Sequence, residues 1–449
     1  MPSHSRASGS PASGSPASSS VLRDRDFRLL WLGQAASQFG AQAGLVVLPL
    51  IAVVTLDVST GRLGALRAVE QAPILLFSLF VGAWVDRRRT RDVMVLSDLG
   101  RALALAAVAL ACPLGVLGLP TLFVVAFVLG VLGVFFDVAY QACLVRLVTR
   151  DQLARGNSAL EGSRSAAQIG GPALGGALVS VLSAPVAALA SAGFFAVSAL
   201  SIRRVQGVRG VRGVHGVQGV RGVRGVRRHE APPTSLWRQI LEGLRLVAGH
   251  PALRAVGFAS AAFQFCFAAL MTLYLLFLPR GLQLSGAAVG LALAATGPGA
   301  VVGSLLAARL PGRFGHGRVL VASALLGDGV LLCVPALHGS GTVTVCLLMG
   351  INLVFGVFSQ LVNVTVMAVR QAVTPVELQG RVVATINFVG MGLTPLGSLL
   401  GGFLADELGL RAGLLAAAVG MTLSPLSMAL SPLARLGRTL PGRQRTMPG

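Results

Sequence analysis

The sequence predicts an all-α integral membrane protein in which twelve transmembrane helices form two pseudo-symmetric six-helix bundles. Of its 449 residues, 54% are hydrophobic and 12% are charged, about half the charged share of a typical soluble domain. Apolar runs of roughly 20 residues, the length that crosses about 30 Å of hydrocarbon, recur along the chain. The loops between these runs repeat once at a constant offset, which predicts that the two bundles arose by duplication.

The apolar runs define the expected helices, because only a helix satisfies its own backbone hydrogen bonds in lipid. The first six spans are expected at about 29–55, 65–85, 93–114, 121–145, 158–182 and 184–202. The second six are expected at about 252–278, 286–309, 318–337, 342–368, 381–405 and 411–433. We therefore expect an N-terminal bundle over residues 21–203 and a C-terminal bundle over residues 251–434.

The duplication is clearest in the loop that joins the fourth and fifth spans of each half. The segment VTRDQLARGNSA in the first half matches VTPVELQGRVVA in the second, so that Thr149 corresponds to Thr374 and Leu153 to Leu378. Parallel six-helix repeats of this kind place a substrate path between the halves, near the middle of the membrane.

The distribution of arginine predicts the orientation in the membrane. The formal net charge is +21, and only Arg62, Arg280 and Arg411 fall in the loops on the side opposite the termini. Short loops rich in arginine stay in the cytoplasm. We therefore expect a multi-pass protein of the cell membrane with both termini in the cytoplasm.

Three segments outside the bundles are expected in the cytoplasm. Residues 1–20 are rich in Ser and Pro and are predicted to be disordered, and residues 435–449 form a C-terminal tail. The linker at 204–250 contains a Gly-Val-Arg repeat, Val205–Arg228, whose arginines are expected to hold it near anionic headgroups. RNA binding by the repeat is the weaker alternative, because no aromatic residues are interleaved. Residues 235–249 are expected to form an amphipathic surface helix.

Acidic residues inside the spans are the first candidates for chemistry, since a charge at the bilayer centre costs about 2.5–3.5 kcal/mol on insertion scales. Asp137 and Asp328 lie well inside their spans and are candidate protonatable groups. The alternative for each is a hydrogen bond to a neighbouring helix. Glu70 is a third candidate, for which a local pair with Arg67 is the alternative.

Two acid–base pairs lie near the inner ends of their spans. Asp98 and Arg101 in the third span, and Glu161 and Arg164 in the fifth, have i, i+3 spacing. Residues at this spacing are neighbours on one helix face. Structural ion pairs are therefore the expected role of both.

Uncharged polar side chains inside the spans are candidates for lining an aqueous substrate cavity, with hydrogen bonding between helices as the alternative. Gln34 and Gln38 share one face of the first span with Gln42. The remaining candidates are Gln264 in the seventh span and Asn352, Gln360 and Asn363 in the tenth.

A glycine-rich segment in the fifth span is a candidate hinge. It contains Gly171, Pro172, Gly175 and Gly176. Small residues let helices approach closely, and proline removes one backbone hydrogen bond and permits a bend. Tight packing without bending is the alternative.

The sequence argues against an enzyme and against a cofactor. The five cysteines lie in apolar runs, without a Cys-x-x-Cys pair or a neighbouring histidine, so no metal site is expected. Ser, His and Asp show no arrangement for nucleophilic catalysis. The chain contains no lysine, and therefore no glycine-rich loop ending in Gly-Lys for ATP.

The segment GAWVDRRRTR at 82–91 is too highly charged for hydrocarbon and is expected to be a loop between the second and third spans. Gly82, Asp86, Arg87 and Arg91 resemble a loop signature of the major facilitator superfamily, Gly-x-x-x-Asp-Arg/Lys-x-Gly-Arg/Lys-Arg/Lys, with Arg89 in place of the second glycine. The resemblance implies that this loop stabilises the outward-facing state, with Asp86 meeting a neighbouring helix end.

Further segments carry the same resemblance. GPALGG at 171–176 is similar to the core of the superfamily's antiporter motif, Gly-Pro-x-x-Gly-Gly, with Ser158 and Ala167 in place of its upstream glycines. The segments at 27–40, 97–103 and 370–382 look like the subgroup that holds the enterobactin and macrolide exporters. The resemblance implies a transporter that works by alternating access and exports a hydrophobic or amphipathic small molecule, such as a drug or a siderophore-like compound, by proton antiport.

Two alternatives remain open at this point. An importer or facilitator of a small metabolite could have the same fold. A non-transporting membrane receptor or scaffold would need a large ordered extramembrane domain. The expected partners are a small-molecule substrate, protons and the lipid bilayer; we expect no nucleic acid and a monomer.

Overall fold

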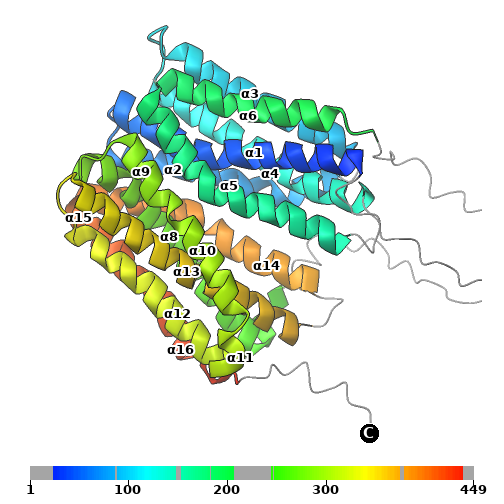
Figure 1. The fold of residues 1–449 in the computed structure, drawn as a ribbon, viewed down its shortest axis with the longest axis vertical. Helices are drawn as coiled ribbons and strands as arrows, with labels where there is room; N and C mark the ends of the chain where they lie inside the picture. The colour runs from blue at the N-terminus through cyan, green and yellow to red at the C-terminus, as the bar shows by residue number, and fades with distance from the viewer. Residues whose placement is uncertain are drawn as a thin grey trace, which may run out of the picture.

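The computed structural model describes residues 24–85, 88–147, 153–182, 184–206, 244–245, 247–374 and 379–437, and this part of the chain contains helices but no β-strand. The helices of the two halves converge at one end of the molecule and splay at the other, where α1 begins (Figure 1). We name the splayed end the inner end and the opposite end the outer end, following the predicted orientation.

Six long helices make up the N-terminal half. They are α1 (Arg25–Leu50, followed by the π-helical turn η2, Ile51–Thr55), α2 (Thr60–Val85), α3 (Thr90–Ala111), α4 (Leu119–Leu147), α5 (Leu153–Val181) and α6 (Ala184–Arg203). The chain enters α1 through an N-cap, in which the Asp24 carboxylate accepts hydrogen bonds from the backbone N–H groups of Asp26 and Phe27. Each helix corresponds to one predicted span.

Most of the six spans of the C-terminal half combine two helical elements. They are α8 (Pro251–Leu276) with η3 (Phe277–Gly281), α9 (Gly286–Ala294) with α10 (Thr296–Ala307), α12 (His316–Val330) with η4 (Leu331–Ala336), α13 (Thr342–Val373), α14 (Gln379–Gly392) with the first part of α15 (Thr394–Met421), and the rest of α15 with α16 (Leu423–Ala429). The short α11 (Leu310–Phe314) joins the eighth and ninth spans. Gly409 (φ 79°) turns the chain between the last two spans. The predicted fold of twelve transmembrane helices is confirmed.

The two halves repeat each other in backbone detail as well as in helix order. α1 and α8 both end at the outer side in a π-helical turn, η2 and η3. A non-glycine residue with positive φ follows each turn, Asp57 at 44° and Gln283 at 56°. Such backbone is uncommon outside glycine, so its presence at corresponding positions supports the duplication inferred from the loops.

Several expected features lie outside the described residues. These include the tail at 1–20, the Gly-Val-Arg repeat beyond residue 206, most of the surface helix expected at 235–249, the residues after 437, and Asp86 and Arg87 of the loop signature.

Candidate functional site

Two glycine crossings join the halves in their outer parts. Where α2 crosses α15, a Cβ atom on Gly64 would lie 2.7 Å from the Ser398 carbonyl oxygen and 2.9 Å from Gly402 Cα. Where α5 crosses α9, a Cβ atom on Gly176 would lie 2.6 Å from Gly290 Cα. Backbones this close leave no room for a side chain. The second and eleventh spans, and the fifth and eighth, are therefore in direct backbone contact.

Polar contacts close the outer end beside these crossings. The carboxylate of Asp57, after the first span, lies 2.6 Å from a guanidinium nitrogen of Arg280, which precedes the eighth span. The Thr60 hydroxyl at the start of α2 donates a hydrogen bond to Asp406 of α15. Further inward, Gln71 of α2 donates to the Ser398 hydroxyl at 3.3 Å. The halves are thus linked at the outer end.

The hinge segment of α5 divides between two helix contacts. Gly171 and Gly175 face α1. A Cβ atom on Gly171 would lie 3.3 Å from the backbone nitrogen of Ala43, and one on Gly175 would lie 2.7 Å from the carbonyl oxygen of Ala43. Gly176 faces the other half. Pro172 lies inside the helix, and its carbonyl oxygen would lie 3.1 Å from a Cβ atom on Gly290. The segment therefore packs α5 tightly on both sides; bending at Pro172 stays a prediction.

A buried ion pair ties together four helices of the N-terminal half. Asp98 and Arg101 of α3 form an ion pair, and their side chains are 0% and 6% exposed. The Ser37 hydroxyl of α1 donates to Asp98 at 3.1 Å and accepts from Arg101 at 3.0 Å. The Arg101 guanidinium lies 4.7 Å from the ring centroid of Phe136 on α4 and 4.5 Å from that of Phe195 on α6. Stacking on two aromatic faces favours the charged guanidinium in this apolar setting.

Asp137 lies beside this pair and differs from it in exposure. It is exposed although it lies on α4 ten residues before the helix end at Leu147, roughly 15 Å along the axis. The positive charges that act on it belong to Arg101 of α3 and Arg164 of α5. Arg164 is itself exposed. An accessible carboxylate at this depth, with cations from two other helices nearby, can bind a proton or a cationic group.

The other two candidate acids have different surroundings. Glu70 of α2 is 13% exposed and lies 3.5 Å from Arg67, whose guanidinium also donates to the Leu45 carbonyl at 3.3 Å. Asp328 of α12 is 4% exposed, and its charge acts on the Cys266 thiol of α8. Neither carboxylate is as accessible as that of Asp137.

The uncharged candidates also differ in what they contact. Gln34 is buried and accepts a hydrogen bond from Ser163 at 2.9 Å. Asn352 is buried and donates to the Tyr274 hydroxyl at 2.6 Å, so it lies in the core of the C-terminal half. Of the rest, Gln38, Gln264 and Gln360 are half-buried, and Asn363 is exposed.

Gly82 and Arg91 of the loop signature lie within the described residues. Arg91 contacts Asp92 at 3.4 Å and donates a hydrogen bond to the Val205 carbonyl at 2.9 Å, which ties the start of α3 to the end of α6. Gly82 lies within α2 and Arg91 within α3, so the predicted loop over 82–91 is wrong at both ends, where the helices extend into it. The Glu161 side chain lies outside the described residues, so its expected pair with Arg164 stays a prediction.

Sequence reasoning did not single out the partners across the interface. Gly286 and Gly290, which face Gly176, have the Gly-x-x-x-Gly spacing that marks close helix contacts in membranes, and this spacing was a usable signal. No comparable signal marked the Asp57–Arg280 or Thr60–Asp406 contacts.

Comparison with known proteins places this geometry among membrane transporters. A family model described as Major Facilitator Superfamily matches residues 30–392 and 256–445. The multidrug efflux pump Tap of Mycolicibacterium fortuitum is 28% identical over 363 residues, which cover 77% of this chain and 81% of that protein. The multidrug efflux pump Tap of Mycobacterium tuberculosis (strain ATCC 25618 / H37Rv) is 28% identical over 401 residues, which cover 85% and 87%.

Solved structures share the fold. A bacterial homologue of the iron transporter ferroportin, in an inward-facing state, aligns with a TM-score of 0.67 at 17% identity and covers 90% of this chain and 99% of that one. A point mutant of the nucleoside transporter NupG aligns with a TM-score of 0.68 at 12% identity, covering 90% and 98%. At these identities the likeness concerns the fold alone.

Proposed function

The chain belongs to the major facilitator superfamily, and we propose that it exports hydrophobic or amphipathic small molecules in exchange for protons. Membership makes it a multi-pass membrane transporter and not an enzyme. Both Tap relatives are named multidrug efflux pumps, and their likeness extends over 77% and 85% of this chain, which supports export. We infer export, its coupling to protons and the roles of the residues below.

The observation that carries the proposal is the exposed carboxylate of Asp137 inside α4. A coupling acid must bind a proton in one state of the cycle and release it in another. With the halves splayed at the inner end (Figure 1), an exposed carboxylate on α4 can exchange its proton with the inner side. The ionised group can then accept a hydrogen bond from the polar part of an amphipathic substrate.

The contacts between the halves supply the conformational part of the cycle. The crossings at Gly64–Gly402 and Gly176–Gly290, with the Asp57–Arg280 pair, hold the outer end closed. Rocking of one half against the other would part these contacts and release substrate outward. Protonation of Asp137 from the outer side would complete the exchange.

The first test measures accumulation of a panel of fluorescent lipophilic dyes and antibiotics in cells that express the protein. We expect lower accumulation than in cells without it, and we expect a protonophore to abolish the difference. Asp137→Asn should lose export, whereas Glu407→Gln, an exposed acid at the outer end of α15, should keep it. Normal export by Asp137→Asn would contradict the assigned role, and higher accumulation in expressing cells would indicate import.

Glu70 and Asp328 remain the alternatives for the coupling acid. Glu70→Gln and Asp328→Asn, in the same assay, distinguish them from Asp137. Loss of protonophore-sensitive export in one of these variants, with Asp137→Asn active, would move the coupling role to that residue.

A further inference from the structure

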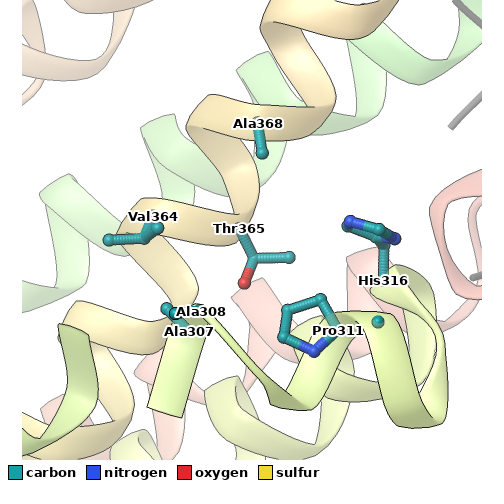
Figure 2. Close-up of a pocket in the computed structure, with 8 residues that line it drawn as sticks. Ala307, Ala308, Pro311, His316, Val364, Thr365 and Ala368 are labelled. Atoms are coloured by element: carbon teal, nitrogen blue, oxygen red, sulfur yellow. The ribbon is translucent and has the colours of Figure 1, made fainter. Parts of the chain in front are cut away.

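A cavity of about 240 Å³ lies at the inner end of the C-terminal half. Figure 2 shows Pro311 and His316 on one side of it and Thr365 and Ala368 of α13 on the other, with Ala307 at the end of α10. Apart from the histidine ring and the threonine hydroxyl, the walls are small and apolar. The Thr365 hydroxyl already donates to the Leu361 carbonyl at 2.7 Å.

The cavity is lined by one half of the protein only. Its lining comes from α10 to α13 and the turns that join them, all within the C-terminal half. On α13, Val364 lines the cavity and lies nine residues from Phe355, which places the two on opposite faces of the helix. The Phe355 ring stacks on Phe267 of α8 at 5.7 Å between centroids. A molecule in the cavity would therefore sit outside the proposed transport path.

Arginines adjoin the lining residues in the sequence: Arg309 follows Ala308, and Arg313 follows Gly312. Arg309, Arg313 and Arg318 are exposed and form no ion pair within the described residues. The sequence contains no acidic residue between Glu242 and Asp328. Their charge is available to an anion from outside the protein.

The surface beside the cavity is apolar. Leu305 of α10 is 66% exposed and Phe314 of α11 is 52% exposed. The Arg313 guanidinium lies 5.4 Å from the Phe314 ring centroid, so charge and apolar surface adjoin. Arginines in a short loop at the end of a span are typical of the inner membrane–water boundary. This part of the protein is therefore suited to the headgroup level of the inner leaflet.

We propose that the cavity and its arginines bind an anionic phospholipid of the inner leaflet. Arg309 and Arg313 would hold the phosphate, and the cavity would take the glycerol and the upper part of one acyl chain. The cavity volume is roughly eight times the 30 Å³ or so that a water molecule occupies in the liquid, which suits this portion of a lipid. The rest of the chains would lie along Leu305 and Phe314. A free phosphate would leave the apolar walls without a function.

The test measures the melting temperature of the purified full-length protein in detergent with added phosphatidylglycerol, phosphatidylcholine or inorganic phosphate. We expect phosphatidylglycerol alone to raise it. The double variant Arg309→Gln/Arg313→Gln should need roughly 25-fold more phosphatidylglycerol for the same rise, about fivefold per arginine at an anionic surface. Arg28→Gln, which removes an exposed arginine at the inner start of α1, should behave like the unmodified protein.

A second variant tests the apolar part of the site without changing charge. Gly312 lines the cavity, and a Cβ atom added there meets nothing within 4 Å, so Gly312→Leu should fill the cavity and leave the melting temperature without lipid unchanged. We expect it to weaken the response to phosphatidylglycerol, and native mass spectrometry should find less retained lipid. Three results would each overturn the proposal. Arg28→Gln could weaken the response to phosphatidylglycerol as much as the double variant does, or phosphatidylcholine or inorganic phosphate could raise the melting temperature equally. The third is a full response to phosphatidylglycerol in Gly312→Leu.

Discussion

Substituting Gly176 with alanine should open the outer end of the transporter. The added Cβ atom would lie 2.6 Å from Gly290 Cα, whereas ordinary contacts of this kind begin at 3.4 Å. The Gly286 carbonyl oxygen would lie closer still. Because these neighbours are backbone atoms, relief needs a separation of α5 from α9 of at least about 0.8 Å, the difference between the two distances given. Overpacking of this kind costs about 1–3 kcal/mol. That cost falls on the closed outer end and shifts the equilibrium towards outer-open conformers by roughly 5- to 150-fold.

The shift can be measured as a distance between the outer loops of the two halves. Spin labels at Val116→Cys and Ser340→Cys, both exposed outer-loop positions, would report it by double electron–electron resonance in a protein without the native cysteines. Gly175→Ala is the matched control. Its Cβ atom would lie 2.7 Å from the Ala43 carbonyl oxygen, inside the N-terminal half, and should lower the melting temperature without lengthening the distance.

Two results would refute this reasoning. In the first, Gly176→Ala gives the same distance distribution as the unmodified protein, so the α5–α9 crossing does not hold the outer end closed. In the second, Gly175→Ala lengthens the distance as much as Gly176→Ala, so the effect arises from general loosening of α5.

Three further substitutions should change stability by different amounts. Arg280→Gln removes an ion pair whose acid, Asp57, is 92% exposed. The substitution should lower the free energy of unfolding by less than about 1 kcal/mol, and its effect on the melting temperature should disappear in 1 M salt. A larger loss of stability that persists in salt would contradict this. Asp98→Asn leaves the Arg101 charge buried without its partner and should cost about 3–5 kcal/mol of folding stability. The double variant Asp98→Asn/Arg101→Met should recover part of this loss. A double variant no more stable than the single one would argue against an ion pair. Tyr274→Phe removes the hydroxyl that accepts from the buried Asn352 amide and should cost about 1 kcal/mol in chemical denaturation. No change would mean that the other hydrogen bond of this amide, to the Leu348 carbonyl at 2.9 Å, is sufficient.

The fold was predictable because lipid imposes strong constraints on a chain. Runs of roughly 20 apolar residues identify helices without any knowledge of their packing, and the repeated loop containing Thr149 and Thr374 revealed the two halves. The break of the eighth span between Ala294 and Thr296 was not predictable from hydropathy. Hydropathy records burial in lipid and not the local backbone path.

The candidate site was predictable by residue type but not by surroundings. In the sequence, Asp137 and Asp328 are equivalent acids inside apolar runs. The structure separates them because exposure depends on which helix face points towards other helices, and this follows from packing across the whole bundle. For the same reason, the spacing of Asp98 and Arg101 indicated their pairing, whereas the aromatic rings around Arg101 come from distant parts of the chain.

Export coupled to protons through Asp137 can be measured with purified protein in liposomes. A pH gradient, acidic inside, would be imposed with no other energy source, and uptake of a dye exported by cells would be followed. We expect uptake by the protein molecules whose inner end faces the outside of the vesicle. This uptake should stop when the gradient is collapsed. It should be absent for Asp137→Asn, although both proteins still bind the dye. Uptake that continues without the gradient, or gradient-driven uptake by Asp137→Asn, would contradict it.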